Sequence, residues 1–520
     1  MLGGTAELTR GRLLVRNVAL NAAGWALPAI CAIFAIPALV GAMGAERFGL
    51  LAIAWALVGS FSPFDLGIGR ALTQALSERV GRSDQEESPD LTWSALWLMG
   101  AVGALGALAL VLAAPALAGR WLRVSPGLEA EAAHAFRLLA LAVPLTVVTS
   151  GFRGVLEAGQ AFRAVNALRV PLALLTFVGP WAIQPLSHGL PASVLVLVGA
   201  RALVCGLHAF VAVRLYPTLR RPRLPRAAAL QGLWRVAGWM TVSSLSNPIL
   251  VTGDRFLIGA ALPMAAVAQY AAVSEVASKL GVVAAVLQPV LFPAFAATLA
   301  ADPRRAAVLF DRGVRATTFA LAPAALVVVA FAPEGLHLWL GPVMARDAAP
   351  VLQLLAVAAY VNTCAQMPFS ALQGAGRADV PAKLHVLEVP LYLGTLWLLV
   401  DRFGLIGAAI AWLLRMLVDT LALYAAVPLV LRDAGTPLRV VLGRAVGLTV
   451  GGAAALAVCA LATSLAARAG LATVGLAAFV VGARRWLLSG DERALTQAWF
   501  QSRRGAWRTR HAAARASRAS

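Results

Sequence analysis

Long apolar stretches separated by short polar segments run along the whole chain. A helix needs about 20 mostly apolar residues to cross the roughly 30 Å hydrocarbon core of a bilayer. By that criterion the sequence predicts an all-α bundle of about fourteen membrane spans. They lie near residues 18–40, 48–68, 92–117, 138–156, 170–188, 191–213, 236–261, 266–298, 315–333, 349–372, 384–400, 404–430, 441–466 and 471–486.

The composition agrees with a chain that lies mostly in lipid. Of the 520 residues, 60% are hydrophobic and 13% are charged, and the mean hydropathy is +0.79. A soluble domain is nearer half apolar and a quarter charged. The 4 cysteines stand singly in apolar stretches without a CxxC pair. We therefore predict no disulfide, no metal site and no cofactor.

The positive charges favour one orientation of the spans. Loops rich in Lys and Arg stay on the cytoplasmic side. With a cytoplasmic N-terminus, roughly three quarters of the 44 Lys and Arg residues fall in cytoplasmic loops or in the C-terminal tail. We predict a multi-pass protein of the bacterial inner membrane with both termini in the cytoplasm. The net charge of +20 then needs no nucleic-acid partner, because the tail can lie near anionic lipid headgroups.

Weak internal repetition divides most of the chain into two similar halves. Residues 138–142 and 156–160 resemble residues 354–358 and 372–376. Parallel six-span repeats are typical of transporters with a site between two lobes. The predicted units are an N-terminal six-helix lobe (1–213), a basic cytoplasmic linker (214–235), a C-terminal six-helix lobe (236–430), two accessory helices (431–486) and a basic cytoplasmic tail (487–520).

Ionisable side chains at membrane depth are costly and are usually functional. The deepest are Arg201, Glu275, Lys279, Arg415 and Asp419. Glu275 and Lys279 are four residues apart, as are Arg415 and Asp419, so each pair can neutralise itself, either as a structural tie or in a site. The Arg201 guanidinium suits a phosphate if it faces a cavity, or an acid on another helix if it does not. Nearer to the ends of their spans lie Asp65, Asp254, Arg255 and Glu388.

Several short motifs follow one another between residues 15 and 430. They are GAERFGL at 44–50, DLGIG at 65–69, LEAGQAF at 156–162, DRFLIG at 254–259 and LQGAGR at 372–377. This set resembles the bacterial O-antigen and exopolysaccharide flippases of the multidrug/oligosaccharidyl-lipid/polysaccharide (MOP) superfamily. The resemblance implies two lobes around a V-shaped, basic cavity and outward transfer of an undecaprenyl-diphosphate-linked oligosaccharide, often with a cation or proton gradient. Asp65, Asp254 and Arg255 occupy motif positions.

We therefore expect a transporter that flips a polyprenyl-diphosphate-linked oligosaccharide by alternating access, for surface polysaccharide biosynthesis. We expect a monomer, with a polysaccharide polymerase or other assembly proteins as candidate partners. The candidate cavity cations are Arg201, Lys279, Arg415 and Arg255. The candidates for ion or proton coupling are Asp65, Asp254, Glu275 and Asp419.

Two other functions stay open at this point. A drug/cation antiporter of the related multidrug and toxin extrusion family would favour uncompensated acids in its cavity. A membrane glycosyltransferase or polymerase would favour a large outer loop with a catalytic set. The longest predicted outer loop spans only residues 118–137, so we expect no enzymatic activity.

Overall fold

The computed structural model describes residues 11–61, 68–81, 88–159, 161–226, 249–281, 295, 298–299, 302–431 and 438–486. All regular secondary structure in these residues is helical. The first half holds α1 (Gly11–Ser60), α2 (Ile68–Gly81), α3 (Ser88–Ala116), η2 (Leu117–Trp121), α4 (Glu129–Ala140), α5 (Ala142–Ala158), α6 (Phe162–Ala182), α7 (Leu190–Leu215) and η3 (Pro217–Arg220). The second half holds a helical stretch at 249–261 and α9 (Met264–Leu280), α11 (Pro303–Leu340), α12 (Pro342–Gly374), α13 (Asp379–Ala426), α14 (Pro428–Leu431), α15 (Leu438–Leu461) and α16 (Leu465–Trp486).

Ten helical stretches among the described residues are long and apolar enough to cross a membrane. Two of them, Ile30–Gly59 and Asp379–Leu431, each include residues of two predicted spans. The stretch at 249–261 and α9 hold the described parts of the seventh and eighth spans. The described helices therefore contain at least part of every predicted span, and the all-α fold is confirmed.

Glycines produce two of the three breaks within the described long helices, and the third lies at Phe331 of α11. Gly44 in α1 has φ 81° and Gly404 in α13 has φ 58°. Side chains with a Cβ rarely adopt such positive φ values, so glycine allows the helix to reverse its direction there. Each of these two bends lies between two predicted spans, which explains why one continuous helix assignment covers both.

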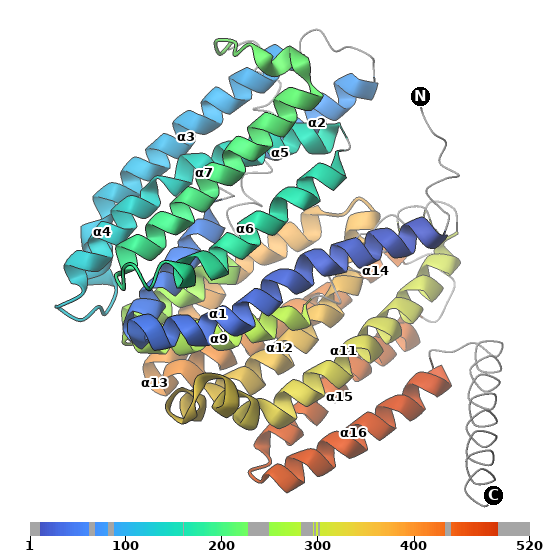
Figure 1. Cartoon of the computed structure of the whole chain (residues 1–520). Helices are drawn as coiled ribbons and strands as arrows, with labels where there is room; N and C mark the ends of the chain where they lie inside the picture. The colour runs from blue at the N-terminus through green and yellow to red at the C-terminus, as the bar shows by residue number, and fades with distance from the viewer. Residues whose placement is uncertain are drawn as a thin grey trace, which may run out of the picture.

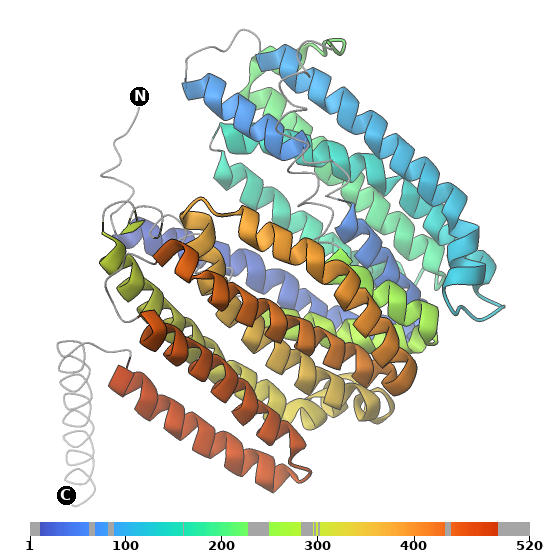
Figure 2. The same cartoon turned by 180° about the vertical axis from the view of Figure 1, so that it is seen from behind.

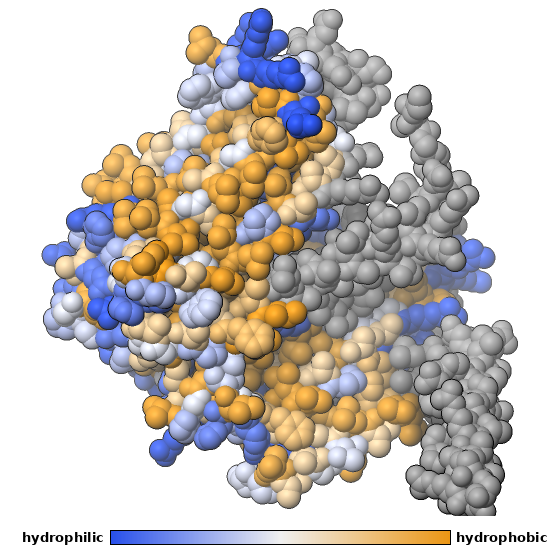
Figure 3. Space-filling view, viewed as in Figure 1, coloured by the Kyte–Doolittle hydropathy of each residue, from blue (hydrophilic) through white to orange (hydrophobic). Residues whose placement is uncertain are grey.

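Two groups of helices form the molecule, with α1 and α9 between them (Figures 1 and 2). One group contains α2 to α7 and the other contains α11 to α16. The first turn of α1 and the last turn of α16 lie at the same end of the bundle. Apolar residues dominate the middle of the face shown in Figure 3, and polar residues gather towards its edges. Such a surface suits a bundle that crosses a bilayer.

The connection that follows α5 has the same geometry as the connection that follows α12. The Ala161 amide donates to the Leu156 carbonyl at 2.8 Å, and the Arg377 amide donates to the Leu372 carbonyl at 2.9 Å. These are corresponding positions of the two sequence repeats. The local structure therefore agrees with the internal duplication, while the lobe boundaries stay a prediction.

A short helix, α2, was missed by the sequence analysis, which predicted a loop after residue 68. Its buried residues include Ile68, Leu72 and Leu76, spaced four apart, and they pack in one cluster with residues of α3 and α5. This spacing gives one apolar face on an otherwise polar helix. A search for long apolar runs does not detect such a helix.

The predicted linker at 214–235 is not a free connector over its first part. Arg223 and Arg226 both pair with Asp90 at the start of α3, at 2.8 and 2.5 Å. The Trp97 indole donates to the Arg223 carbonyl at 3.1 Å. Residues 216–226 are thus held along α3. Residues 227–235 lie outside the described residues.

Prolines inside the helices leave carbonyl groups without their usual donor, and side chains of other helices satisfy some of them. Pro37 has no N–H for the Ile33 carbonyl, which accepts from the Trp339 indole at 2.5 Å. Pro333 likewise cannot serve the Val329 carbonyl, which accepts from the Gln353 amide at 2.9 Å. The neighbouring helices therefore stabilise these interrupted turns, as lipid cannot.

Candidate functional site

A cavity of about 1100 Å³ lies between the two groups of helices. Its wall combines residues of α2 and α5 with residues of 251–255, α9, α12 and α13. At one end the lining includes Glu157, Gln373 and Gly281, which lie at or next to the C-terminal ends of α5, α12 and α9. At the other end it stops at the depth of Arg255 and Tyr270. The cavity therefore extends from one end of the bundle into its middle.

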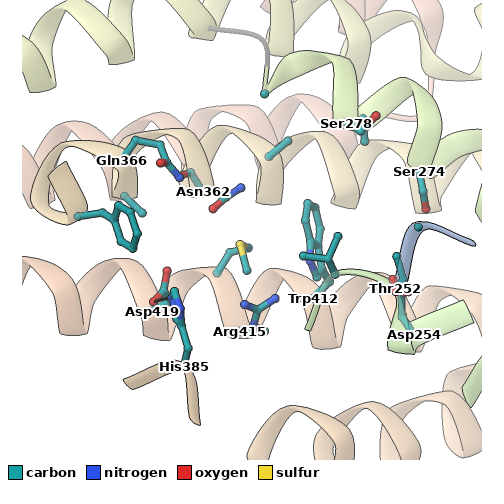
Figure 4. A pocket seen from close by; sticks show the side chains of 18 of the residues that line it. Thr252, Asp254, Ser274, Ser278, Asn362, Gln366, His385, Trp412, Arg415 and Asp419 are labelled. Carbon is teal, nitrogen blue, oxygen red and sulfur yellow. Dashed lines mark hydrogen bonds and ion pairs between the residues drawn. The ribbon is translucent and has the colours of Figure 1, made fainter. Parts of the chain in front are cut away.

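The lining is polar although the surrounding helices are apolar. Figure 4 shows Asn362 and Gln366 of α12 opposite Arg415 and Asp419 of α13. The charged lining residues are the arginines Arg153, Arg255 and Arg415 and the acids Glu157, Asp254 and Asp419. Positive and negative groups are equal in number, so these residues do not make the strongly basic cavity that the family resemblance implies.

Four of the eight predicted site residues line this cavity, and Asp254 and Arg255 are two of them. Asp254 is buried and accepts hydrogen bonds from the Tyr270 hydroxyl at 2.7 Å and from the Arg255 amide at 2.8 Å. These bonds stabilise its carboxylate. The Arg255 guanidinium makes no ion pair or hydrogen bond within the described part of the chain, so it is available to an anion in the cavity.

Arg415 and Asp419 do not neutralise each other, contrary to the prediction from their spacing. The Arg415 guanidinium donates to Glu388 at 3.3 Å and to the Leu250 carbonyl at 3.0 Å, and it lies 5.4 Å from the centre of the Tyr392 ring. Both charges of the Arg415–Glu388 pair are buried. Arg415 is therefore held by the wall, although it touches the cavity.

Asp419 faces His385 instead, with 3.5 Å between the carboxylate and Nε2. His385, Glu388 and Asp419 each place one donor atom within 4.8 Å of the others. A proton or a metal ion could occupy such a set, although the Arg415 guanidinium on Glu388 makes a second cation electrostatically costly. His385 was not predicted from the sequence as a site residue, and Glu388 was predicted only to lie near the end of its span. Their i, i+3 spacing on one helix was the available signal.

Arg153 is a further lining residue that the sequence analysis did not select, because it counted this arginine with the cytoplasmic loops. Its guanidinium lies 3.6 Å from Glu157, and both side chains are partly exposed. An exposed pair of this kind contributes little to stability. Arg153 can therefore exchange its partner for a bound anion at low cost.

Three of the four remaining predicted residues are described, and none of these three is among the cavity-lining residues. Glu275 and Lys279 form the predicted ion pair with each other on α9, and neither is among the described residues that line the cavity. Arg201 of α7 is also not among them, and it has no ion pair within the described residues. Asp65 lies outside the described residues.

Sequence comparisons relate the chain to surface polysaccharide assembly. A family model described as "Polysaccharide biosynthesis protein" matches residues 14–299, which is more than half of the chain. The Shigella flexneri protein named "Putative O-antigen transporter" is 27% identical over 424 residues, which is 79% of this chain and 96% of that protein.

Solved structures with the same fold are transporters. The lipid II flippase MurJ in an inward closed conformation aligns with a TM-score of 0.69 at 12% identity, over 89% of this chain and 98% of that chain. An inward-facing multidrug resistance MATE family transporter of the MOP superfamily aligns with a TM-score of 0.67 at 16% identity, over 80% of this chain and 100% of that chain. At these identities the similarity establishes the fold alone.

Proposed function

The chain belongs to the polysaccharide biosynthesis protein family, and on that premise we propose that it flips a lipid-linked oligosaccharide across the inner membrane. The substrate class is a polyprenyl-diphosphate-linked oligosaccharide, with undecaprenyl as the polyprenyl chain. The Shigella flexneri relative, an O-antigen transporter by its name, supports a substrate of this kind. Alternating access of a central cavity is the mechanism that the fold favours.

The free guanidinium of Arg255 carries this proposal. It lines a polar cavity at membrane depth without an ion pair in the described residues, and an arginine in such a place suits a diphosphate, which it can bind through two parallel hydrogen bonds. Arg153 on the opposite group of helices offers a second cation. The sugar would meet the amide and hydroxyl groups of the wall, such as Asn362, Gln366 and Thr252, while the polyprenyl chain stays in lipid.

The cavity geometry fits loading from the cytoplasm. Its lining extends to the ends of α5 and α12. The positive charges that follow these ends, at Arg163 and Arg169 and at Arg377 and Lys383, favour a cytoplasmic location for them. The described conformation would then accept the substrate at the cytoplasmic face. We accordingly propose that both termini lie in the cytoplasm and that transport is outward.

We infer that His385 and Asp419 hold the proton that couples transport to a gradient. They face each other at 3.5 Å at the cavity wall, so a proton placed there is exchangeable with water in the cavity. Among the other candidates, Asp254 is engaged with Tyr270 and Glu275 is paired with Lys279. Asp65 stays a candidate from its motif position alone.

Arginine variants test the assignment of the cavity. A strain that lacks the protein is complemented with wild type, Arg255→Ala, Arg255→Lys or Arg201→Ala, and surface polysaccharide is measured together with the amount of protein in the membrane. Loss of one charged hydrogen-bonding partner corresponds to about 1.5–3 kcal/mol, or roughly a tenfold to a hundredfold loss of affinity. We expect a severe defect for Arg255→Ala, a partial one for Arg255→Lys and near-normal polysaccharide for Arg201→Ala.

Equal complementation by wild type and Arg255→Ala would contradict the role of Arg255. Normal polysaccharide in the strain without the protein, together with a new sensitivity to cationic drugs, would instead identify the antiporter function. Binding of polyprenyl diphosphate to the purified variants separates a binding defect from a folding defect. Arg201→Ala is the matched control, because Arg201 is not among the described residues that line the cavity.

A further inference from the structure

The end of the cavity opposite the C-terminal ends of α5, α9 and α12 is closed by three segments from different parts of the chain. The lining of the cavity stops at Tyr270 on α9, about 9 Å along the helix from its first residue, Met264. Beyond that depth, residues 46–49 of α1 and the segment 122–125 meet residues 259–264. The first two segments precede the predicted linker, and the third follows it.

A glycine allows the backbones of α1 and α9 to touch at this point. A Cβ on Gly49 would lie 2.1 Å from the Met264 carbonyl oxygen and 2.9 Å from its carbonyl carbon. Both groups belong to the backbone and cannot rotate away. Phe48 and Met264 beside the contact are fully buried. Only glycine permits α1 and α9 to approach this closely, and the approach leaves no passage between them.

The second contact joins segment 122–125 to the residues before α9. The Arg123 amide donates to the Gly259 carbonyl at 2.8 Å, and Arg123 forms an isolated parallel bridge with Pro263. A Cβ on Gly259 would lie 2.9 Å from the Met264 methyl group and 3.0 Å from a Leu122 methyl group. The contact thus combines a backbone hydrogen bond with close apolar packing.

Segment 122–125 is fastened to α1, so the two segments act as one unit. Glu46 accepts from the Ser125 amide and from the Ser125 hydroxyl, both at 2.8 Å. Arg47 next to it pairs with Glu131 of α4 at 3.0 Å, and Glu131 also accepts from the Leu190 amide at 2.7 Å. A movement of the first group of helices together with α1 would carry both segments away from residues 259–264.

We propose that Gly49 and segment 122–125, closing against residues 259–264, form the gate at the outer end of the cavity. Gly49 is a positioning residue of this gate, because a side chain at that position separates α1 from α9. The inference rests on the proposed alternating-access function and on the predicted orientation. A single hydrogen bond and packed methyl groups cross the gate between Arg123 and Gly259, so it can open without breaking a buried ion pair.

Accessibility of the cavity from either side of the membrane tests the gate without any substrate. The probe is a cysteine at Ser274, which lines the cavity, in a background where Cys31, Cys205, Cys364 and Cys459 are replaced. A membrane-impermeant maleimide is applied to spheroplasts, which present the outer face, and to inside-out vesicles, which present the cytoplasmic face. We expect Ser274→Cys to react in the vesicles and to be protected in the spheroplasts.

The decisive variant is Gly49→Val, with Gly41→Val as its matched control on the same helix. Within the described part of the chain, a Cβ on Gly41 meets no atom closer than 4 Å. We expect Gly49→Val to raise the labelling rate in spheroplasts about tenfold or more, as the open state becomes populated, and Gly41→Val to leave it unchanged. Equal protection of the two variants in spheroplasts, with normal labelling in vesicles, overturns the proposal.

A second variant keeps the test valid if Gly49→Val does not enter the membrane. Gly259→Leu places its side chain into the Met264 and Leu122 contacts. Gly253→Leu on the same helical stretch is the control, because a Cβ on Gly253 meets only Ile249 among the described residues, at 3.7 Å. We expect spheroplast labelling to increase for Gly259→Leu alone. A protein that fails to flip polysaccharide can still show this pattern, so the gate and the substrate are tested separately.

Discussion

Removal of the Arg415 side chain is the sharpest test of the charged cavity wall. Arg415 and Glu388 are 10% and 6% exposed in their side chains, and one Glu388 oxygen has no hydrogen-bond partner in the described residues. Arg415→Met would leave the Glu388 carboxylate buried without its cation. Loss of one partner of a buried ion pair costs about 3–5 kcal/mol, whereas neutral replacement of both partners costs much less.

The double variant Arg415→Met/Glu388→Gln should recover most of that loss. It still lacks the charged hydrogen bond from Arg415 to the Leu250 carbonyl, which contributes about 1.5–3 kcal/mol. We expect the melting temperature of the purified protein in detergent, followed by the fluorescence of its 14 tryptophans, to fall most for Arg415→Met and to recover in the double variant. Arg153→Met is the matched control, because the Arg153–Glu157 pair is partly exposed and contributes little to stability, and we expect it to melt like wild type.

Two results would refute this reasoning. If Arg415→Met melts at the wild-type temperature, the pair does not compensate the buried charge of Glu388. If the double variant melts no higher than Arg415→Met, the loss comes from packing against Tyr392 and from the Leu250 bond, and the charge of Glu388 is not the cause.

Three further predictions concern side chains that join helices or hold a proton. Gln353→Leu removes the donor to the Val329 carbonyl, so we expect a loss of about 1–3 kcal/mol as a lower melting temperature; an unchanged one would show that another donor substitutes. Arg468 is buried and pairs with Glu334 of α11 through two bonds, at 3.0 and 2.7 Å. Arg468→Met should therefore speed amide hydrogen exchange in α16 and leave exchange in α12 unchanged. The same exchange rate in α16 for wild type and variant would contradict the role of Arg468 in holding α16 against α11. His385→Asn removes the imidazole that faces Asp419 at 3.5 Å, so an imposed pH gradient should accelerate transport by wild type and not by this variant. Equal acceleration of both would place the coupling proton elsewhere.

Local features of the chain were sufficient for much of the fold. A membrane span depends on about 20 consecutive residues, so the apolar runs predicted helices that the structure contains. Positive-φ glycines at 44 and 404 separate two pairs of these spans. The amphipathic helix α2 was missed because its apolar face is narrow and its overall composition is polar.

The candidate site was predicted only in part, because local sequence patterns do not show which helices pack against one another. Asp254 and Arg255 were selected from a motif, and Arg415 and Asp419 from their depth, and all of them line the cavity. Spacing along one helix correctly paired Glu275 with Lys279. It wrongly paired Arg415 with Asp419, because Arg415 bonds Glu388 instead, which lies 27 residues earlier in the chain.

Runs of consecutive residues indicate that this chain crosses a membrane many times, roughly where each crossing lies, and which family it resembles. The packing of the helices is needed to see that Arg415 bonds Glu388, 27 residues away, that Arg255 has no ion pair among the described residues, and that Gly49 touches Met264. The physical reason is that burial in lipid is determined by consecutive residues, whereas ion pairs and close contacts depend on which helices pack together. That packing depends on the whole bundle, so no local pattern contains it.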